Sequence, residues 1–547
     1  MFEFNLIRHK NPELFFAVVA PVGADLDKLC QHLTRALLKF DYALEPIHVI
    51  SLLKRISRPK YLQNEAPNEY RRIKGRMDAG DKFREKVQRD DALALLSLHK
   101  VWEFRQNSHS KLVPDKAALT PVHRQAFLFR SLKRPEEVTA LRRIYGSNLI
   151  VIGLHCARER RVQNLSERIA RSAYRTQAEQ YRDKAEQLVL RDEADESKAH
   201  GQRLRSAFSM ADVFLDSSDS KVLTEDLERF LNLLFGKPVI TPTKSEVGMA
   251  HAYIAAMRSA EMGRQVGAAI VNDVGHVIAA GSNEVPRYGG GTYWERESPD
   301  FRDWQKGKDS SDEFKRASLG ELLDIFSRKA KLAGNFARRE TSAQIEEVLP
   351  LLRQTRYMQL IEFVRAVHGE MSALMDAAMR GVSVRGCTMY VTTFPCHECA
   401  RHIIASGISK VYYIEPYAKS LAMELHDDAI QLDAETESRK VPFLPFLGVA
   451  PRAYNQLFSM SRRKNRDGTV ISWDERSANP RVSGSFWSYV QYEKEDVNIL
   501  DETFHQKGVK LQLPERETRD RKTKSRNGRS SKRRSTMARV ATKRRSA

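Results

Sequence analysis

The first 240 or so residues alternate short apolar runs with segments of helical periodicity. The run LFFAVVA, from Leu14 to Ala20, precedes a segment in which leucines recur at helical spacing, and a second apolar run, IHVISLL, follows at 47–53. QAFLFRSL, KRPEEVTALRRIYG and NLIVIGLHC repeat the same order further along. Alternation of this kind predicts a parallel sheet flanked by helices. We therefore expect an α/β fold.

The length of 547 residues predicts two or three domains, because it exceeds what one ordinary core holds. The segment KPVITPTKSE marks the expected boundary between the first two. We assign residues 1–240 to a first α/β domain, 241–513 to a second and 514–547 to a disordered basic tail. Within the second domain, a polar, Gly-rich stretch over about 286–354 is expected to be an insertion.

Positive charge is concentrated at the end of the chain. Of the net formal charge of +21, the segment from Arg521 to Ala547 supplies twelve, because it holds twelve Lys or Arg and no acid. This segment has too few apolar residues to bury a core. Two interpretations stay open for it: contact with RNA or DNA through phosphates, or a solvated chain end without a partner.

The distribution of apolar residues and cysteines indicates the compartment. No run of about eighteen apolar residues is present, so no membrane-spanning helix is expected. The start, MFEFNLIRHK, has an early acid and no long apolar core, which argues against a secretory signal. The five cysteines are an odd, sparse set that does not indicate a disulfide framework. We expect a cytoplasmic protein.

The loop PVGADLDKL follows the first apolar run, where an α/β domain places a phosphate at a helix N-terminus. A Walker loop needs a second glycine followed by Lys and then Ser or Thr. Here Gly23 has no second glycine, and Lys28 is followed by Leu29. Gly23 and Lys28 are therefore weak candidates for nucleotide binding, and an ordinary strand-to-helix turn is the favoured interpretation.

Two short motifs in the second domain carry metal chemistry. The segment IEFVRAVHGEMSALMDAAMRG is expected to be one helix that contains His368 and Glu370. PCHEC follows a predicted strand and places Cys396 and Cys399 three residues apart, on the same side of a first helical turn, with Pro395 at its first position. Two thiolates and one imidazole leave a tetrahedral position open, which is typical of a catalytic rather than a structural zinc site.

The order H-x-E and then P-C-x-x-C is the signature of the zinc nucleobase deaminases. In that chemistry His368, Cys396 and Cys399 hold Zn²⁺, and Glu370 carries protons between water, the ring and the departing amine. A C-x-x-C pair alone is more often redox-active or structural, so the two motifs together support the prediction.

The segments RQVGAAIVND, GSNEVP, HGEMSAL and TTFPCHECARHIIASGI resemble the cytidine and deoxycytidylate deaminase superfamily. The order of the two domains resembles the bacterial anti-phage dCTP deaminases, in which a degenerate P-loop-kinase-like domain precedes the deaminase. The resemblance implies deamination of free deoxycytidine nucleotides, dCTP or dCMP, and depletion of the dCTP pool that phage replication needs. It also implies that Asn283 binds the substrate sugar, although Glu284 follows where the family usually has glycine.

The sequence also predicts partners, and it leaves two alternative functions open. The expected partners are free deoxycytidine nucleotides, a regulatory nucleotide or RNA at the first domain, and further copies of the chain in a homo-oligomer. One alternative keeps the chemistry but acts on RNA or single-stranded DNA, which the basic tail favours. The other is a nucleic-acid-binding protein with a structural zinc, which an intact Glu370 argues against.

Overall fold

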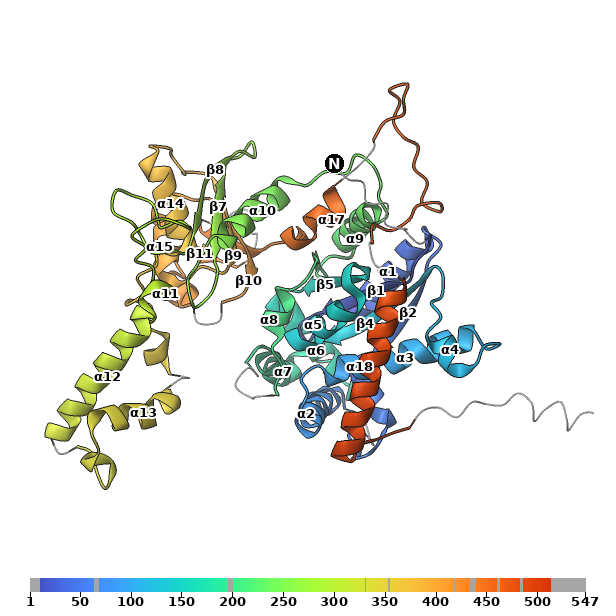
Figure 1. Ribbon diagram of the computed structural model, residues 1–547, viewed down its shortest axis with the longest axis horizontal. Coiled ribbons are helices and arrows are strands. Elements are labelled where there is room, and N and C mark those ends of the chain that lie inside the picture. Colours follow the sequence, from blue (N-terminus) through green and yellow to red (C-terminus); the bar gives the residue numbers. More distant parts are fainter. Residues whose placement is uncertain are drawn as a thin grey trace, which may run out of the picture.

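Two six-stranded sheets organise the computed structural model (Figure 1). The structure describes residues 10–62, 68–194, 200–329, 331–352, 355–417, 420–432, 439–459, 463–482 and 486–512. The basic tail predicted over 514–547 lies outside the described residues. The mixed α/β class with parallel strands is confirmed.

The first sheet has the strand order β13-β6-β5-β1-β4-β2. Its strands are β1 (Leu14–Val19), β2 (Ala43–His48), β4 (Gln125–Leu132), β5 (Leu149–His155), β6 (Val213–Asp216) and β13 (Gly448–Val449). All pairings are parallel except that of β13 with β6. The carboxyl ends of β4, β1 and β5 therefore lie side by side at one edge.

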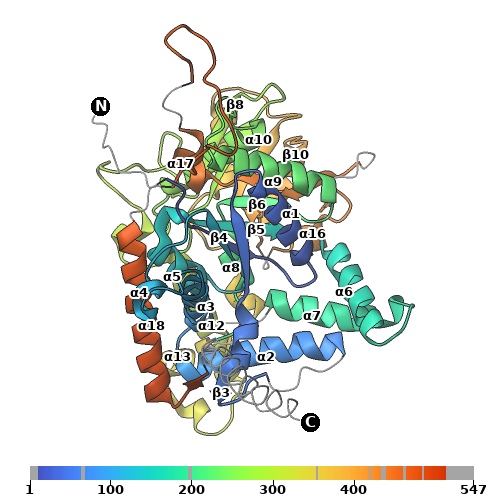
Figure 2. The same cartoon turned by 90° about the vertical axis from the view of Figure 1, so that its right-hand side faces the viewer.

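Helices cover both faces of this sheet, which explains why its central strand is apolar throughout. Phe15 and Val19 of β1 belong to one buried cluster, and Leu14 and Phe16 belong to the other. The first cluster packs under α2 (Glu69–Val87), α3 (Ala92–Ser108), α5 (Pro135–Tyr145) and α18 (Phe486–Lys507). The second packs under α1 (Leu26–Leu38) and α9 (Ser220–Leu234). Helices α6 (Arg158–Ser172) and α7 (Arg182–Ala194) lie beside α2 (Figure 2).

One predicted strand of the first sheet is wrong. The run at 47–53 was expected as a strand, but the strand there is β2, Ala43–His48, and the following residues Val49–Arg55 form a 3₁₀ helix. Val49, Leu52 and Leu53 are buried in that helix. The apolar content of this run comes from packing at a helical turn rather than from a buried strand.

The second sheet has the order β11-β12-β10-β9-β7-β8. Its strands are β7 (Gly267–Val271), β8 (Val277–Ser282), β9 (Thr388–Thr393), β10 (Lys410–Glu415), β11 (Ile430–Gln431) and β12 (Val441–Pro445). Strand β7 is antiparallel to β8 and β9, whereas β9, β10, β12 and β11 pair in parallel. The helices that pack here are α10 (Lys244–Met257), α14 (Gly369–Met379) and α15 (His397–Ala405).

The predicted insertion contains long helices. Helices α12 (Ser310–Arg328) and α13 (Thr341–Leu352) pack on each other and project from the second sheet as an arm (Figure 1). The remaining short elements are β3 (Ile56–Arg58), α4 (Pro114–Ala118), α8 (Leu204–Phe208), α11 (Asp303–Lys306), α16 (Ala422–Leu425), α17 (Tyr454–Phe458) and β14 (Lys510–Leu511). No helix of the described residues is long and apolar enough to cross a membrane.

The residues from β13 to 512, which were expected in the second domain, pack with the first domain. Strand β13 joins the edge of the first sheet, α18 packs against α3 and α5, and β14 pairs with β3. The second sheet is therefore an insertion between α9 and β13 of the first fold. At this junction Glu246 of α10 pairs with Arg229 of α9 at 2.7 Å and accepts a hydrogen bond from the Val449 amide at 2.9 Å.

Candidate metal centre

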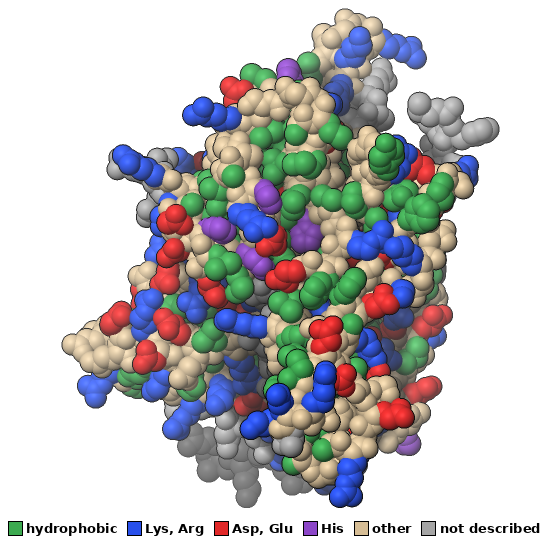
Figure 3. Space-filling view, turned by 90° about the vertical axis from the view of Figure 1, so that its left-hand side faces the viewer, with side chains coloured by type: hydrophobic (Ala, Val, Ile, Leu, Met, Phe, Trp, Pro, Cys, Tyr) green, Lys and Arg blue, Asp and Glu red, His purple; other side chains and the backbone are tan. Residues whose placement is uncertain are grey.

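His368, Cys396 and Cys399 converge in the second sheet's half of the molecule. The Nδ1 atom of His368 lies 3.3 Å from Sγ of Cys396 and 3.4 Å from Sγ of Cys399. The three ligand atoms all lie within 4.8 Å of one another. On the face of the molecule that carries this half, histidine side chains gather among hydrophobic ones (Figure 3). The structure thus brings together all three ligands that the motifs predict.

The N-termini of two helices create this convergence. His368 is the N-cap of α14 and Cys396 the N-cap of α15, and Sγ of Cys396 accepts from the Cys399 amide at 3.4 Å. Two details of the prediction are wrong here. Residues 361–367 precede α14 rather than join it, because Val367 forms an antiparallel bridge with Glu284. Pro395 lies before the cap and not at the first helical position.

Hydrogen bonds within the cluster shift the pKa values of the two thiols in opposite directions. The Cys399 thiol donates to the Cys396 sulfur, which lowers the pKa of Cys396 to about 4 and raises that of Cys399 well above its usual value. The hydrogen bond to Cys396 raises the pKa of His368 to about 9. Both shifts favour a thiolate at Cys396 and an imidazolium at His368. Zinc binds neutral imidazole and thiolate, so metal binding has to displace the protons of His368 and Cys399.

The donor set and its spacing fit zinc. Two cysteine sulfurs and one imidazole nitrogen are ligand types that zinc prefers. A tetrahedral site with Zn–S of about 2.3 Å and Zn–N of about 2.1 Å has sulfur–nitrogen edges of about 3.6 Å. The observed separations of 3.3 and 3.4 Å match these edges within a few tenths of an ångström. Three protein ligands leave the fourth position to water or substrate.

Glu370 lies beside the ligands, in the first turn of α14. It is 4% exposed, and its carboxyl group is close enough to Cys396 and His368 to feel their charges. Burial raises its pKa to about 7. A carboxyl group in this environment is suited to both taking and returning a proton near neutral pH.

The side chain of Asn283 is engaged with the backbone beside β7. Its Oδ1 accepts from the Val266 amide at 2.7 Å, and its Nδ2 donates to the Arg264 carbonyl at 2.7 Å. Asn283 thus fixes the segment that leads into β7. One amide hydrogen and further lone pairs remain for a substrate. A direct role in binding sugar stays a prediction.

Gly23 and Lys28 lie at the first sheet, in the other half of the molecule. Gly23 has φ +90°, and a Cβ there would come within 2.7 Å of the Arg161 carbonyl. The Lys28 amide donates to the cap residue Asp25 at 2.9 Å. The turn is closely packed against α6, and nucleotide binding by Gly23 and Lys28 stays a prediction.

Three residues to which the sequence assigned no role lie within electrostatic reach of this cluster. Glu261 contributes to the raised pKa of His368, and burial followed by the negative charge of Cys396 raises the pKa of Tyr417. Arg264 pairs with Glu415 at 3.1 Å. The positive charge of Arg264 partly offsets the rise in the pKa of Tyr417. These side chains come from loops beside β7 and after β10. No short-range signal in the sequence links them to the H-x-E motif.

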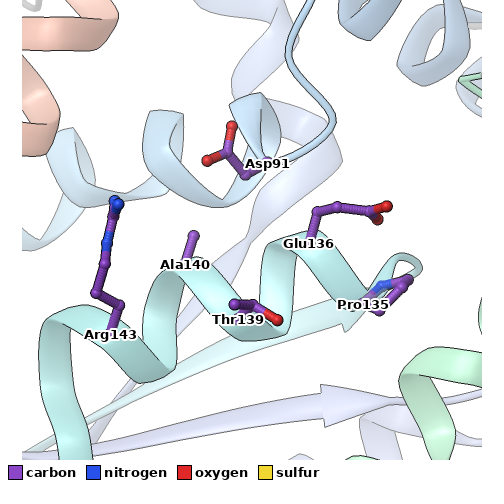
Figure 4. Close-up of a pocket in the computed structure, with 6 residues that line it drawn as sticks. All are labelled: Asp91, Pro135, Glu136, Thr139, Ala140 and Arg143. Carbon is purple, nitrogen blue, oxygen red and sulfur yellow. The ribbon is translucent and has the colours of Figure 1, made fainter. Parts of the chain in front are cut away.

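A pocket of about 290 Å³ lies elsewhere, against α5 and the start of α3 (Figure 4). Its lining residues are Asp91, Pro135, Glu136, Thr139, Ala140 and Arg143. The charged members already have partners, since Asp91 pairs with Arg89 and Arg143 with Asp496. None of the metal ligands lines this pocket.

Comparison with known proteins places the metal centre in a family. Residues 242–415 match the model described as the cytidine and deoxycytidylate deaminase zinc-binding region. The deoxycytidylate deaminase of Enterobacteria phage T2 is 48% identical over 54 residues, 10% of this chain and 29% of the phage protein. The probable deoxycytidylate deaminase of Drosophila melanogaster is 30% identical over 166 residues, 30% of this chain and 56% of that protein. The crystal structure of dCMP deaminase from the cyanophage S-TIM5 with dCMP and dUMP shares 17% identity and a TM-score of 0.21, over 38% of this chain and 99% of that one.

The class that the site defines is a zinc-binding α/β domain with a buried glutamate at the metal. The chain spans less than two thirds of the phage and fly relatives, which the match covers to 29% and 56%. Residues 242–415 thus match the zinc-binding region of the cytidine and deoxycytidylate deaminases, and the metal ligands lie within that match.

Proposed function

We propose that this chain is a zinc-dependent hydrolase that deaminates free deoxycytidine nucleotides, converting dCTP to dUTP and, within the same substrate class, dCMP to dUMP. The observation that carries the proposal is the buried Glu370 beside the cluster of His368, Cys396 and Cys399. The named relatives are deoxycytidylate deaminases, which supports a free nucleotide as the substrate.

The residues divide the chemistry among them. Bound zinc supplies an activated water, because coordination lowers the pKa of water to about 7. His368, Cys396 and Cys399 orient the metal, and the helix N-termini that carry the ligands favour thiolates at this position. Glu370 would take one proton from the water and deliver it to N3 of the cytosine, and would then take the remaining hydroxyl proton and pass it to the amine that leaves C4. Ammonia and the uracil nucleotide are the products.

The direct test is incubation of the purified chain with dCTP, dCMP, single-stranded DNA and RNA, with the uracil product quantified for each. Turnover of a free nucleotide, abolished by Glu370→Gln, supports the proposal. Turnover of only the polynucleotides would make the chain an editing-type deaminase. Absence of uracil in all four reactions from zinc-loaded protein would contradict an enzymatic function.

We further propose that the first domain restrains the deaminase and that release depletes dCTP during phage infection. The support is the sequence resemblance to anti-phage deaminases and one packing feature. The buried cluster that contains Phe15 also includes Met249 of α10 and Tyr390 of β9, so a single core links the two halves. Plaque counts on bacteria that express the wild type or Glu370→Gln test this role. Equal counts would contradict it.

A further inference from the structure

An acidic pair on α7 neutralises two cations at the edge of the first sheet where strands β4, β1 and β5 end. Asp192 is 1% exposed, and its Oδ2 accepts from the Val22 amide at 2.7 Å while its Oδ1 pairs with Nζ of Lys133 at 2.8 Å. The next residue, Glu193, pairs with Arg161 at 2.5 Å. One turn of α7 thus meets three donors from three different segments.

The three donors follow strands that are neighbours in the sheet. Val22 lies in the loop after β1, Lys133 directly follows β4, and Arg161 lies in the first turn of the helix after β5. Lys133 is fixed in place because its Nζ also donates to the Ala20 carbonyl at 2.8 Å. In open α/β sheets, ligands bind outside the carboxyl ends of the strands. The cations therefore lie where this type of fold receives a ligand.

The guanidinium group of Arg161 has N–H donors that no described group accepts from. The residue is 7% exposed, and among the described residues its Nε and Nη1 atoms are buried without a hydrogen-bond partner. Buried donors without a partner are uncommon and call for an explanation. Arginine presents its donors as a planar fork that suits carboxylate or phosphate oxygens. Only one nitrogen of this fork, Nη2, meets Glu193.

Helix α7 is held outside the main cores of the first domain. Its buried residues Ala185, Leu188 and Val189 pack in a small separate cluster with α6 and with Met77 of α2 (Figure 2). Its last two acidic residues, Asp192 and Glu193, are the part that reaches the sheet edge. A buried ion pair adds little net stability of its own, because desolvation offsets the attraction. The pairs made by Asp192 and Glu193 are thus weak grounds for a purely structural role.

We propose that the sheet edge formed by Val22, Lys133 and Arg161 is a binding site for a phosphate chain, and that α7 closes it with Asp192 and Glu193 in the places of the ligand oxygens. Two adjacent carboxylates on two cations correspond to a ligand with at least two phosphate groups. The chain of a nucleoside triphosphate and inorganic tripolyphosphate share this chemistry. Binding exchanges the internal carboxylates for the ligand and frees this turn of α7.

The test measures tripolyphosphate and ATP binding to the full chain by calorimetry, so it does not depend on deaminase activity. We expect Asp192→Asn to bind tripolyphosphate roughly tenfold more tightly than wild type, because a fixed carboxylate repels an anion strongly at close range. Adding Lys133→Met to that variant should reverse the gain. Tighter binding of ATP than of tripolyphosphate would identify a nucleotide as the ligand, and equal binding would identify the phosphate chain alone.

Asp212→Asn is the matched control. Asp212 is also a buried aspartate, which accepts from the Val151 amide at 2.8 Å and pairs with Arg142 at 3.1 Å, but it lies at the opposite edge of the sheet. The same change of charge there should leave binding unaltered, and any binding by the basic tail is common to both variants. Equal affinities of the two variants would overturn the proposal.

Hydrogen exchange on the wild type keeps the proposal testable where a variant does not fold. Saturating tripolyphosphate should increase exchange of the amides of α7, Arg182–Ala194, while those of α9 stay unchanged. Unchanged exchange in α7 would show that the ligand does not displace Asp192 and Glu193.

Discussion

Arg105 of α3 and Glu493 of α18 are 388 residues apart in the sequence, yet their side chains pair at 2.5 Å in the interior of the first domain. Both side chains are fully buried, and Glu13 pairs with the same guanidinium from the other side at 2.7 Å. Burial raises the pKa of Glu493, while Arg105 opposes that shift. The last described helix is therefore an internal part of the first domain.

Glu493→Ala should destabilise the chain by about 3–5 kcal/mol, because it removes one of two carboxylates from a buried guanidinium. Urea unfolding followed by circular dichroism measures the loss. Glu495→Ala, on an exposed position of the same helix, serves as the control and should change stability little. A similar small effect for both variants would show that the buried pair contributes nothing.

Two truncations separate the basic tail from helix α18. Deleting 521–547 should leave nucleotide deamination unchanged and weaken salt-sensitive nucleic-acid binding, because the tail carries charge without an apolar core. Deleting 486–547 should prevent folding of the first domain, since it removes Tyr489 and Glu493 from the core. Loss of deamination in the shorter deletion would place the tail in the site.

Cys399→Ser should remove zinc from the protein, because a serine hydroxyl is a much poorer zinc ligand than a thiolate. Metal analysis of purified protein gives the stoichiometry, expected as one zinc per chain in the wild type. Cys387→Ser is the matched control, since Cys387 is buried in the same half of the molecule but outside the cluster. Stoichiometric zinc in Cys399→Ser would reject the ligand assignment.

Glu370→Gln should lower turnover by roughly a hundredfold to ten-thousandfold with zinc retained, because it removes the proton carrier and leaves each ligand in place. Steady-state kinetics with dCTP or dCMP and metal analysis are read together. Glu398→Gln is the control, since Glu398 lies in the first turn of α15 and pairs with Arg401. A Glu370→Gln enzyme within tenfold of wild type would exclude this role.

A fragment covering 242–447 should deaminate without restraint, because it retains the second sheet through β12. A fragment extended to 513 should aggregate, since α18 would expose the face that α3 and α5 cover. Turnover numbers of the shorter fragment and the full chain are compared. Equal values would contradict restraint by the first domain.

The sequence predicted those features that depend on local pattern. Strand β1 (LFFAVV) and the first six residues of β5 (LIVIGL) are continuous apolar runs because both faces are buried, and such runs are recognisable without knowledge of their neighbours. The metal ligands were predicted because each motif has a fixed spacing that the N-termini of α14 and α15 convert into a shared position.

Features that depend on distant contacts were not predictable. Strand β13 has two residues, Gly448 and Val449, and its partner Phe214 gives no local sign of the pairing. Glu493 lies in a helix whose other glutamates are exposed, so nothing near it indicates a buried partner. Asp192 likewise looks like one more charge in a charged segment until Lys133 is placed beside it.

The adjacency of Glu246 and Val449 shows that the half with the metal centre leaves and rejoins the first sheet at neighbouring points. A half attached in this way is held by two chain connections as well as by the buried cluster that it shares with the first sheet. It cannot rotate freely or move away, as a half on a single linker can. Because its ends are close together, the same half is also suited to transfer as one cassette into another host fold.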